Sequence, residues 1–535
     1  MQRMDEHKIP LVIGVTGHLN PRAEDLEILR ETVKQELAKL RERFPHSPVV
    51  LLCALARGAD LLCAETAEEL GIPLRAVLPM EQAEYEKDFR PEDLVRMRRQ
   101  AARAETVFTA PAAEEEPAEE NRDFRYRQAG IYVAEHSHIL LALWDGKREG
   151  VTDAGTAAAV RAALQGAWKP CRGMACRNAE NIAVLHVKTP RESEPAEEAG
   201  TAVWLGNRDA LDEILARTEE FNRLSESDDG SGYPLLPEDK TIEPELQRLE
   251  TLYRTADNLS MRFGSSYRRK LRTLAILGTI VTFAFLLYDE AEMLPMILAC
   301  VTAVAAAIFV ARNAKRFATH RRYIEYRTLA ETLRVQMFLR YAGSRTEAQH
   351  VMPWTQQRET PWILCALCAV NTQRLPEMKR DIRECWAESQ RQYHEKAEKR
   401  TSGQRGRNNR LLYIAVVTAV LLYFGGLLFE LLCGGLIFTP VFRVQDPAAW
   451  RTILKILLGT VSAGTLFLAS YYGKMSLERK SSDHAKMKVF YAKMEDELEY
   501  RGQTEELMEI LAREELTENA NWCSYQRDNA PELNL

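Results

Sequence analysis

Hydrophobic and polar positions follow two different patterns along this chain of 535 residues. Before about residue 191, short runs of Val, Ile and Leu alternate with longer segments of helical period. After about residue 248, nearly every segment has helical period, and four stretches carry almost no charge. Continuous apolar strands separated by helices are typical of a parallel sheet that is covered on both faces. We therefore predict an α/β domain followed by an all-α region.

The first pattern resolves into strands and helices in alternation. The predicted strands are Leu11–Val15, Val49–Leu55, Leu74–Leu78, Thr106–Thr109, Ile139–Trp144 and Ile182–Val187. The predicted helices are Glu24–Phe44, Ala59–Leu70, Glu81–Ala104, Asn121–Glu135 and Gly155–Gln165. This domain is expected to span residues 1–191. Residues 192–247 are expected to form a connector, with a helix at Asp209–Leu224 between two linkers.

The four uncharged stretches come as two closely spaced pairs. They are Thr273–Tyr288 with Met293–Ala311, and Leu411–Phe429 with Thr452–Tyr472. A helix needs about 17–25 residues to cross a bilayer core, and these stretches meet or nearly meet that length. We predict two transmembrane hairpins, in units at 248–345 and 378–535, with a helical segment at 346–377 between them. The alternative is that all four are core helices of a water-soluble protein.

Basic residues flank both pairs and predict their orientation. The flanking cations are Arg268, Arg269, Lys270, Arg272, Arg312, Lys315 and Arg316 around the first pair, and Arg405, Arg407, Arg410, Lys474, Arg479 and Lys480 around the second. Because Lys and Arg accumulate on the cytoplasmic side, both termini and the α/β domain are expected in the cytoplasm. The charged segment Met1–Lys8 does not have the pattern of a signal peptide.

Composition narrows the classes of partner. The net charge of −6 comes from 71 basic and 77 acidic residues, so no overall basic field favours nucleic acid as a partner. The ten cysteines show no disulfide framework, which suits a reducing compartment. Cys365 and Cys368 form a CxxC pair in an apolar context without a second pair at zinc spacing, so we expect buried side chains and no metal site.

Three glycine-containing turns follow strands of the α/β domain. They are Gly14–His18, Ala56–Asp60, and Asp153–Thr156 after the strand that ends before Asp145 and Gly146. In an open parallel sheet such turns gather at the carboxyl edge, where backbone N–H groups and helix N-termini bind phosphate. We therefore predict a site for a phosphate-bearing small molecule. The candidate ligand-binding residues are Gly14, Thr16, Gly17, His18, Arg57, Gly58, Ala59, Asp60, Asp145, Gly146, Gly155 and Thr156.

The same residues allow a purely structural interpretation. The glycines can serve only to make tight connections between strand and helix. Asp60 can be a helix cap or a favourable charge in a first helical turn. His18 and Arg57 have no capping role, so we regard them as the better ligand candidates.

In these segments the chain resembles the SLOG domain, a nucleotide-binding Rossmann-like superfamily related to the LOG proteins. The resemblance covers about residues 9–190 and rests on Gly14–His18, Arg57–Asp60, Ile72–Pro79, Tyr85 with Asp88 and Phe89, Leu141–Gly146, and Gly155 with Thr156. It implies a Rossmann-like fold and a ligand of the nucleotide, cyclic-nucleotide or ADP-ribose type. No other cofactor is implied.

The helical remainder resembles the SLATT region, the SMODS- and SLOG-associating two-transmembrane effector domain, here present twice. Its ending Glu518–Trp522, followed by Arg527 and then Pro531 with Glu532, fits that family. Together the resemblances imply a bacterial antiviral or conflict system. The α/β domain would sense a nucleotide-derived signal, and the membrane part would form a pore in the inner membrane.

An enzymatic function is the main alternative, because LOG relatives cleave N-glycosidic or phosphoribosyl bonds. Their signature has a glutamate three positions after the threonine that corresponds to Thr156, and this position is Ala159 here. Without that carboxylate, no residue of this helix can stabilise a ribosyl cation or activate water. We therefore predict no catalytic residue. A scaffold that places partners at the membrane is a third possibility.

The apolar stretches carry small residues that favour association of helices in lipid. Ala299, Ala303, Ala307 and Ala311 recur at intervals of four, and Gly459 with Ala463 suggests a similar surface. We therefore expect a homo-oligomer in the bilayer. Glutamine, histidine and carboxylate side chains are absent at mid-membrane, which argues against proton-coupled transport.

Charged residues occur instead near the outer ends of the stretches, where they would line a pore mouth. These residues are Asp289, Glu290, Glu292, Glu430 and Lys455. Glu430 and Lys455 should lie at similar depth, so an ion pair between them is one expectation. The alternative is that Lys455 extends its ammonium group to the water interface.

Overall fold

The computed structural model describes residues 7–111, 121–147, 155–165, 183–192, 198–228, 230–236, 243–372, 380–434, 441–442 and 444–528. Asp153, Ala154, Pro531 and Glu532 therefore lie outside the described residues. The chain divides into two compact units. Unit 1 comprises Met1–Leu259, Glu325–Ile382 and Gln503–Asn521, and unit 2 comprises Ser260–Ile324, Arg383–Gly502 and Trp522–Leu535.

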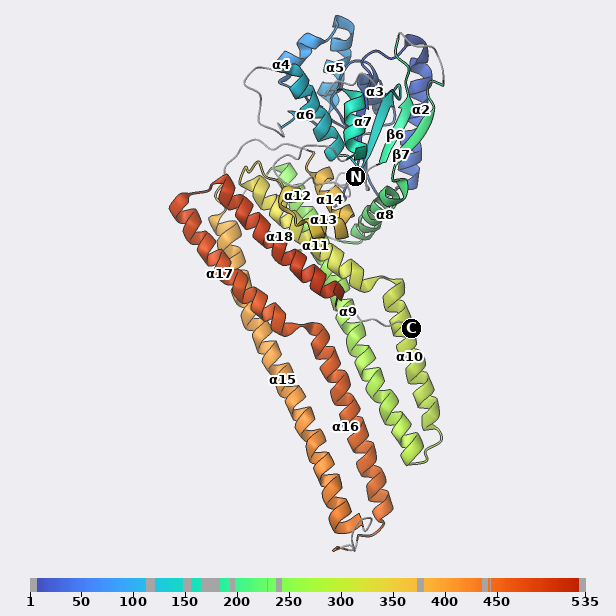
Figure 1. Ribbon diagram of the computed structural model, residues 1–535, viewed down its shortest axis with the longest axis vertical. Coiled ribbons are helices and arrows are strands. Elements are labelled where there is room, and N and C mark those ends of the chain that lie inside the picture. The colour runs from blue at the N-terminus through green and yellow to red at the C-terminus, as the bar shows by residue number, and fades with distance from the viewer. Residues whose placement is uncertain are drawn as a thin grey trace. The chain divides into compact units, whose positions relative to one another are not determined.

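A seven-stranded sheet forms the centre of the α/β part of unit 1 (Figure 1). Its strands are β1 (Leu11–Gly17), β2 (Val49–Cys53), β3 (Leu74–Leu78), β4 (Thr106–Thr109), β5 (Ile139–Trp144), β6 (Ala183–Lys188) and β7 (Ala202–Gly206). Their order in the sheet is β4-β3-β2-β1-β5-β6-β7, and all pairings are parallel except β6 with β7. The six predicted strands are confirmed, and the sheet is parallel over most of its width.

Strand β7 is the strand that the sequence pattern did not predict. It lies within 192–247, which was interpreted as a connector, and it pairs antiparallel with β6 at one edge of the sheet. Its residues are exposed or half-buried, and Val203 is 48% exposed. Ala202–Leu205 is a continuous apolar run, but it is short and lies between polar segments, so the interpretation of 192–247 as a connector overlooked it.

Helices cover both faces of the sheet, as predicted. On one face lie α2 (Leu26–Arg43), α3 (Ala59–Glu69) and α5 (Pro91–Arg103), and on the other α6 (Arg122–Glu135) and α7 (Thr156–Gln165). Leu29, Val33 and Leu37 of α2 recur at helical spacing and are buried with Ile13 and Leu51 of the sheet in one apolar cluster. This periodicity, and not intrinsic propensity alone, determines which face of α2 is buried.

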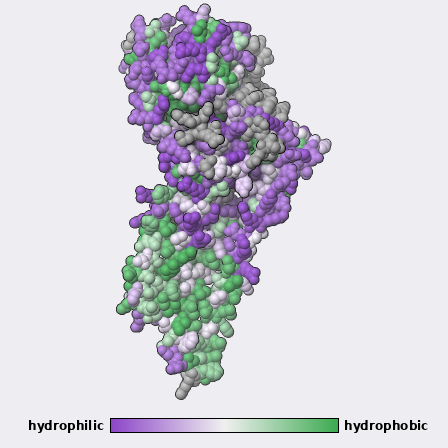
Figure 2. Space-filling view, turned by 180° about the vertical axis from the view of Figure 1, so that it is seen from behind, coloured by the Kyte–Doolittle hydropathy of each residue, from purple (hydrophilic) through white to green (hydrophobic). Residues whose placement is uncertain are grey.

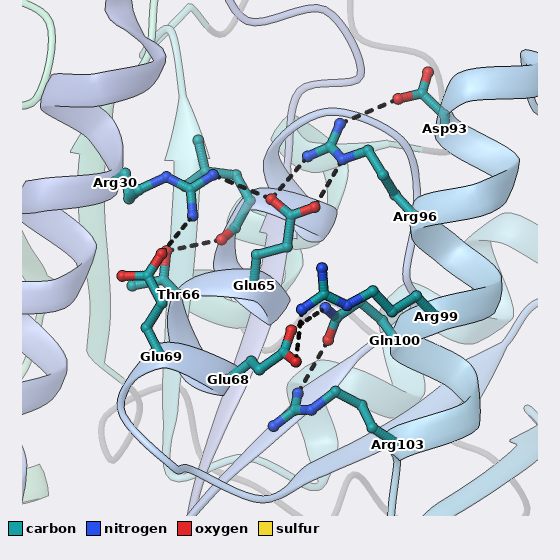
Figure 3. Close-up of polar contacts among 11 residues, drawn as sticks. Arg30, Glu65, Thr66, Glu68, Glu69, Asp93, Arg96, Arg99, Gln100 and Arg103 are labelled. Atoms are coloured by element: carbon teal, nitrogen blue, oxygen red, sulfur yellow. Dashed lines mark hydrogen bonds and ion pairs between the residues drawn. The ribbon is translucent and has the colours of Figure 1, made fainter.

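Ion pairs join the outer surfaces of α2, α3 and α5 (Figure 3). Glu65 of α3 accepts from Arg30 of α2 at 3.1 Å and from Arg96 of α5 at 2.7 Å. Glu68 accepts from Arg99 of α5 at 2.9 Å. Arginines of α2 and α5 therefore pair with glutamates of α3 on the outer side of the apolar cluster.

The single helix predicted at Glu81–Ala104 is wrong, because this segment is broken. It forms α4 (Gln82–Tyr85), a 3-10 turn at Glu86–Asp88, and then α5. Pro91 is the first residue of α5, and Arg90 before it has an extended backbone with ψ of 155°. A residue that precedes proline is sterically kept out of the helical region, so the helix starts anew at Pro91.

Helices pack against the amino edge of the sheet in unit 1. They are α8 (Arg208–Ser225), α12 (Ala348–Val351), α13 (Trp354–Glu359), α14 (Pro361–Val370) and parts of α9 (Pro244–Glu290), α11 (Thr319–Tyr341) and α18 (Glu505–Asp528). The Ile9 N–H before β1 donates to Asn222 Oδ1 of α8 at 2.8 Å. Arg75 near the start of β3 donates to Thr372, which follows α14. The amino edge is thus attached to the helices by specific polar contacts.

Unit 2 contains the apolar helices. Its elements include α10 (Met296–Arg316), α15 (Ser389–Phe429), α16 (Pro447–Met475), α17 (Leu477–Arg501), the π-helical turns η4 (Arg383–Glu388) and η5 (Glu430–Gly434), and the second part of α9. Among the described residues, four helical segments are long and apolar enough to cross a membrane, and they contain the four predicted stretches.

The apolar stretches are exposed on the surface of unit 2. Between 0% and 17% of the residues in the most apolar window of each segment are buried. Figure 2 shows these side chains as a broad hydrophobic surface. Core helices of a water-soluble protein would be buried on most sides. The exposure of these stretches therefore favours a membrane protein over the alternative of a water-soluble core.

Close contacts between α9 and α16 are made possible by glycines. A Cβ atom added at Gly278 of α9 would lie 2.6 Å from Phe467 Cζ of α16, and one added at Gly459 of α16 would lie 2.6 Å from Leu286 Cδ1 of α9. A Cβ at Gly464 would contact Thr279 at 3.4 Å. Large side chains of each helix thus fill positions left open by small residues of the other, the arrangement by which helices associate in lipid.

Candidate functional site

The sheet order places the ends of β1 and β5 next to each other. The chain leaves β1 toward β2 on one side, and later returns to β5 on the other side of β1. Since β1, β2 and β5 are parallel, the turns after them lie at the same carboxyl edge, as predicted. The position between β1 and β5 is the topological switch point at which open α/β sheets bind ligands. We describe this edge as the candidate site.

Asp145, directly after β5, makes polar contacts with three other residues of the site. Its carboxylate accepts from the Lys147 N–H at 3.0 Å and from Arg191 Nε at 2.9 Å, and lies 3.4 Å from His18 Nε2. His18 Nε2 in turn accepts from the Asp145 N–H at 3.0 Å. Burial acts to raise the pKa of Asp145, but the hydrogen bond from the Lys147 N–H and the interactions with His18 and Arg191 outweigh it, so the pKa is lowered. Asp145 therefore ties the ends of β1, β5 and β6 together as a carboxylate.

The turns after β1 and β2 pack directly on each other. A Cβ atom at Gly17 would lie 2.3 Å from Ala59 Cβ, and one at Gly58 would lie 2.6 Å from the His18 carbonyl oxygen. The Ala59 N–H donates to that same carbonyl at 3.1 Å. Gly58 has φ of +82° and the buried Leu55 has φ of +58°, a costly backbone conformation for a leucine. Gly17, Gly58 and Ala59 are thus required for packing whether or not a ligand binds.

Asp60 lies in the first turn of α3 and is 4% exposed. Burial raises its pKa to about 7, and hydrogen bonds from the Ala56 N–H and the Cys53 thiol offset this only in part. The helix cap is Gly58, so Asp60 is a first-turn residue and not the N-cap. The Tyr85 hydroxyl, buried in the same region, has no hydrogen-bond partner among the described residues and feels the charge of Asp60. Asp60 is therefore poised between its neutral and charged forms at physiological pH.

Arg57 is the cation of the site that remains available. It is half-buried, and no hydrogen bond or ion pair of its guanidinium occurs within the described part of the chain. Burial raises the pKa of Tyr126 and the charge of Arg57 opposes this rise, so the two side chains are within electrostatic range. A half-buried guanidinium without a carboxylate partner is suited to bind an anion.

Gly146 and Gly155 differ from the glycines of the first two turns. Gly146 has φ of +84° and Gly155 has φ of +111°. Among the described residues, an added Cβ atom would lie 3.7 Å from His186 Cε1 at Gly146 and would have no neighbour within 4 Å at Gly155. Gly155 precedes the buried Thr156 at the start of α7. The backbone here has a conformation that favours glycine and has space beside it, as an amide-lined anion site requires.

Two other predicted residues lie inside strand β1. Gly14 lies in the middle of β1, where an added Cβ atom would come within 2.2 Å of Ser137 Oγ. Gly14 is therefore needed for the close approach of Ser137 to β1, and it is not part of the turn. Thr16 is half-buried and pairs in register with Ala142 of β5, one residue before Gly17 at the end of the strand.

Sequence reasoning missed several residues of this edge. Arg191 contacts Asp145, and its side chain is 53% exposed, although the sequence pattern marked it only as the last residue of the α/β domain. Asp88, noted only through the family resemblance, accepts from Arg122 at 2.8 Å and from the Tyr126 hydroxyl at 2.5 Å. The one signal available for Arg191 was its position just after a predicted strand, since the carboxyl ends of parallel strands share one edge.

Ala159, at the position of the glutamate in LOG relatives, is 7% exposed. Its Cβ atom lies 4.0 Å from where a Cβ atom at Gly130 of α6 would be. The Ala159 side chain therefore lies in the interface between α7 and α6. Among the described residues, no group of three or more His, Cys, Asp and Glu side chains is placed to hold a metal ion.

The charges predicted at the outer ends of the apolar stretches form different pairs from the expected one. Lys455 of α16 contacts Glu290 of α9 at 2.8 Å. Glu430 of η5 instead forms a two-point pair with Arg451 of α16, at 2.6 and 3.0 Å. Arg451 is a partner that the sequence pattern did not indicate. The pairs tie α9 to α16 and η5 to α16.

Asp289 and Glu292 are exposed, and neither forms an ion pair among the residues that the structure describes. Both lie at or next to the end of α9, in the turn toward α10. They are therefore the carboxylates of the predicted pore mouth that remain available to ions.

Comparison of the chain with protein-family models finds no match, and comparison with curated proteins finds no relative. The interpretation of the site therefore rests on its geometry and on the residues that carry the resemblance.

Proposed function

We propose that this protein is a membrane effector that binds a nucleotide-derived anion at the carboxyl edge of a SLOG-like domain. Binding gates or assembles a pore made by the apolar helices in a SLATT-like arrangement of two transmembrane hairpins. The observation that supports this most strongly is the half-buried guanidinium of Arg57 in the turn after β2, at the same carboxyl edge where His18, Asp145 and Arg191 contact one another. A phosphate group at this edge would supply the anion that Arg57 lacks.

The backbone near Gly146 and Gly155 supplies the second part of the proposed ligand site. Both glycines have positive φ and open space beside them, and α7 begins directly after Gly155. Amide groups in such a turn and the N-terminus of α7 favour the negative charge of a phosphate group. His18 and Asp145 contact each other, and they would hold the turns in place more than contact the ligand.

Signal transmission is proposed to use the opposite edge of the sheet. Ile9, just before β1, donates to Asn222 of α8, and Arg75 near the start of β3 donates to Thr372 after α14. Tyr132 of α6 donates to the Asn371 carbonyl of the same segment. Three helices of this region, α9, α11 and α18, belong partly to each unit. A change in strand positions on ligand binding would therefore reach the apolar helices through continuous helical segments.

The orientation in the membrane follows from the basic residues. We propose that the ends of the apolar helices flanked by Arg and Lys lie in the cytoplasm, with both termini and the sheet. The turns that hold Asp289 and Glu292 then lie on the outer side. In a homo-oligomer these carboxylates would form an acidic ring, which favours cations.

Vesicle leakage with purified full-length protein tests the proposal. The protein is reconstituted into dye-loaded vesicles and mixed with a panel of linear nucleotides, cyclic nucleotides and ADP-ribose derivatives. We expect saturable binding of one class without turnover, and dye release at the same concentrations. Turnover without leakage would support the alternative of a membrane-anchored nucleotide-processing enzyme. Binding with neither result would favour a scaffold.

Arg57→Gln is the variant that tests the placement of the site. Loss of a charge-assisted contact costs about 1.5–3 kcal/mol, or about 10- to 150-fold in affinity. Arg223→Gln is a matched control, because Arg223 is an exposed arginine of α8 that no described residue pairs. Equal affinity in the Arg57 variant and the control would show that the ligand binds elsewhere.

A further inference from the structure

A groove lies between α9 and α10 at the basic ends of their apolar stretches. Its volume is about 150 Å³, and it is lined by Arg269, Lys270, Thr273, Phe309, Val310 and Asn313. One end of the lining is cationic or amide-bearing, and the other is apolar. Phe309 is 68% exposed on the surface that carries the apolar stretches. The lining of the groove therefore matches the two parts of a lipid, with polar side chains for a headgroup and apolar side chains for an acyl chain.

The cations around this groove have no carboxylate partners. Between Ser260 and Tyr288, and between Met293 and Ile324, the sequence contains no Asp or Glu. Within the described residues no ion pair is formed by the following cations of α9 and α10: Arg268, Arg269, Lys270, Arg272, Arg312, Lys315 and Arg316. This contrasts with the α/β part, where arginines such as Arg96 pair with glutamates of neighbouring helices (Figure 3).

Lys270 and Arg269 are placed to bind an anion inside the groove. Lys270 Nζ donates to Thr319 Oγ1 at 2.8 Å, which holds the ammonium group at the groove and leaves two of its N–H bonds free. Burial lowers the pKa of Lys270. Burial and the charge of Arg268 also lower the pKa of Lys480 to about 8. Within the described part of the chain, no carboxylate opposes the lowered pKa of Lys270 or Lys480, and an anion bound beside Lys270 would oppose it.

We propose that this groove binds the phosphate headgroup of an anionic phospholipid, with an acyl chain lying along Phe309 and Val310. Arg269 and Lys270 contact the phosphate, and the Asn313 amide contacts the headgroup beyond it. Basic pockets between transmembrane helices bind anionic lipids by this combination of charge and apolar contact. The bound lipid fixes the relative positions of α9 and α10. A free phosphate ester shares the headgroup chemistry but lacks the acyl chain.

The proposal rests on α9 and α10 crossing the bilayer but not on nucleotide binding at the sheet. Arg57→Gln is therefore expected to leave lipid affinity unchanged. A failure of the nucleotide experiments would not affect the lipid site, and a failure here would not affect the nucleotide site.

Native mass spectrometry of the full-length protein in neutral detergent tests the lipid site. Phosphatidylglycerol, phosphatidylcholine and glycerol 3-phosphate are titrated separately. We expect phosphatidylglycerol to bind at least tenfold more tightly than either of the others. Equal binding of phosphatidylcholine would show that charge is not recognised. Equal binding of glycerol 3-phosphate would show a site for soluble phosphate esters. Either result would overturn the proposal.

Three paired variants separate the groove from the surrounding charge. Arg269→Gln with Lys270→Gln is expected to weaken phosphatidylglycerol binding about 30-fold, from about fivefold for each cation at a lipid surface. Lys315→Gln with Arg316→Gln removes the same charge outside the groove lining and should change affinity less than threefold. Arg269→Lys with Lys270→Arg preserves charge and should retain binding. Equal loss in the first two pairs, or loss in the third, would refute a specific site.

Discussion

Replacing Asp60 by asparagine should stabilise the α/β part of the protein, and more so at high pH. Asp60 is 4% exposed, and among the described residues its carboxyl group accepts a hydrogen bond from the Ala56 N–H and pairs with no cation. Asparagine has nearly the same shape and keeps an oxygen that can accept from the Ala56 N–H. The substitution therefore removes the cost of burying a charge while changing little in the packing.

The magnitude follows from the raised pKa. Burial raises the pKa of Asp60 from 3.8 to about 7, and each tenfold change in an acid dissociation constant corresponds to about 1.4 kcal/mol. Because the folded pKa is the higher one, the contribution of Asp60 to stability is fully present below about pH 4 and is lost as pH rises through about 7. Relative to wild type, the variant should gain about 4 kcal/mol at pH 8.5, about 2 kcal/mol at pH 5, and little below pH 4.

Melting temperatures of the full-length protein in one detergent, measured by intrinsic fluorescence from pH 5 to pH 8.5, provide the assay. A gain of about 4 kcal/mol corresponds to roughly 8–16 °C for a domain of this size. Asp145→Asn is the matched control with the opposite sign, since the pKa of Asp145 is lowered. Its carboxylate contributes stability above its unfolded pKa that is lost as pH falls, so the control should destabilise at pH 8.5. An Asp60 variant no more stable than wild type at pH 8.5 would refute the reasoning.

Three further predictions concern the apolar helices. Gly459→Leu should destabilise the packing of α16 on α9 by about 1–3 kcal/mol, because Leu286 occupies the space beside Gly459. Gly425→Leu is the control, because no described atom lies within 4 Å of a Cβ atom added there. Equal melting temperatures of the two variants in detergent would contradict the predicted packing defect. Lys455→Glu should lower the melting temperature, and adding Glu290→Lys should restore it, because the two side chains are in contact at 2.8 Å. A double variant no more stable than the single one would show that this ion pair contributes nothing. Neutralising Asp289 and Glu292 together should reduce cation selectivity in single-channel recordings, and unchanged selectivity would exclude an acidic ring.

The glycines of the candidate site differ in what their substitution can test. Gly17→Val would place side-chain atoms against Ala59 and disturb the packing of two turns, so a loss of ligand binding would have two causes. Gly155 has open space beside it, and a substitution there acts through its backbone conformation alone. Binding experiments on the site are therefore best made with Gly155→Ala and Arg57→Gln.

The sequence by itself determined the class of architecture. Continuous apolar runs such as Ile139–Trp144 have the length and composition of buried parallel strands, and uncharged stretches such as Leu411–Phe429 are long enough to span a bilayer. Both signals are local, because each depends on the hydrophobicity of consecutive residues. The carboxyl edge of the sheet was likewise predictable, because parallel strands must end on the same side.

Only the tertiary structure decided which residues of that edge are available. Gly17 and Gly58 lie in similar turns to Gly155 in the sequence, but contacts with residues far along the chain make the first two packing positions and leave the third open. In the same way, Glu430 pairs with Arg451 and not with Lys455, because helical rotation and neighbouring helices set the partner of each charge. Such contacts join residues distant in sequence, and no local pattern of hydrophobic and polar positions records them.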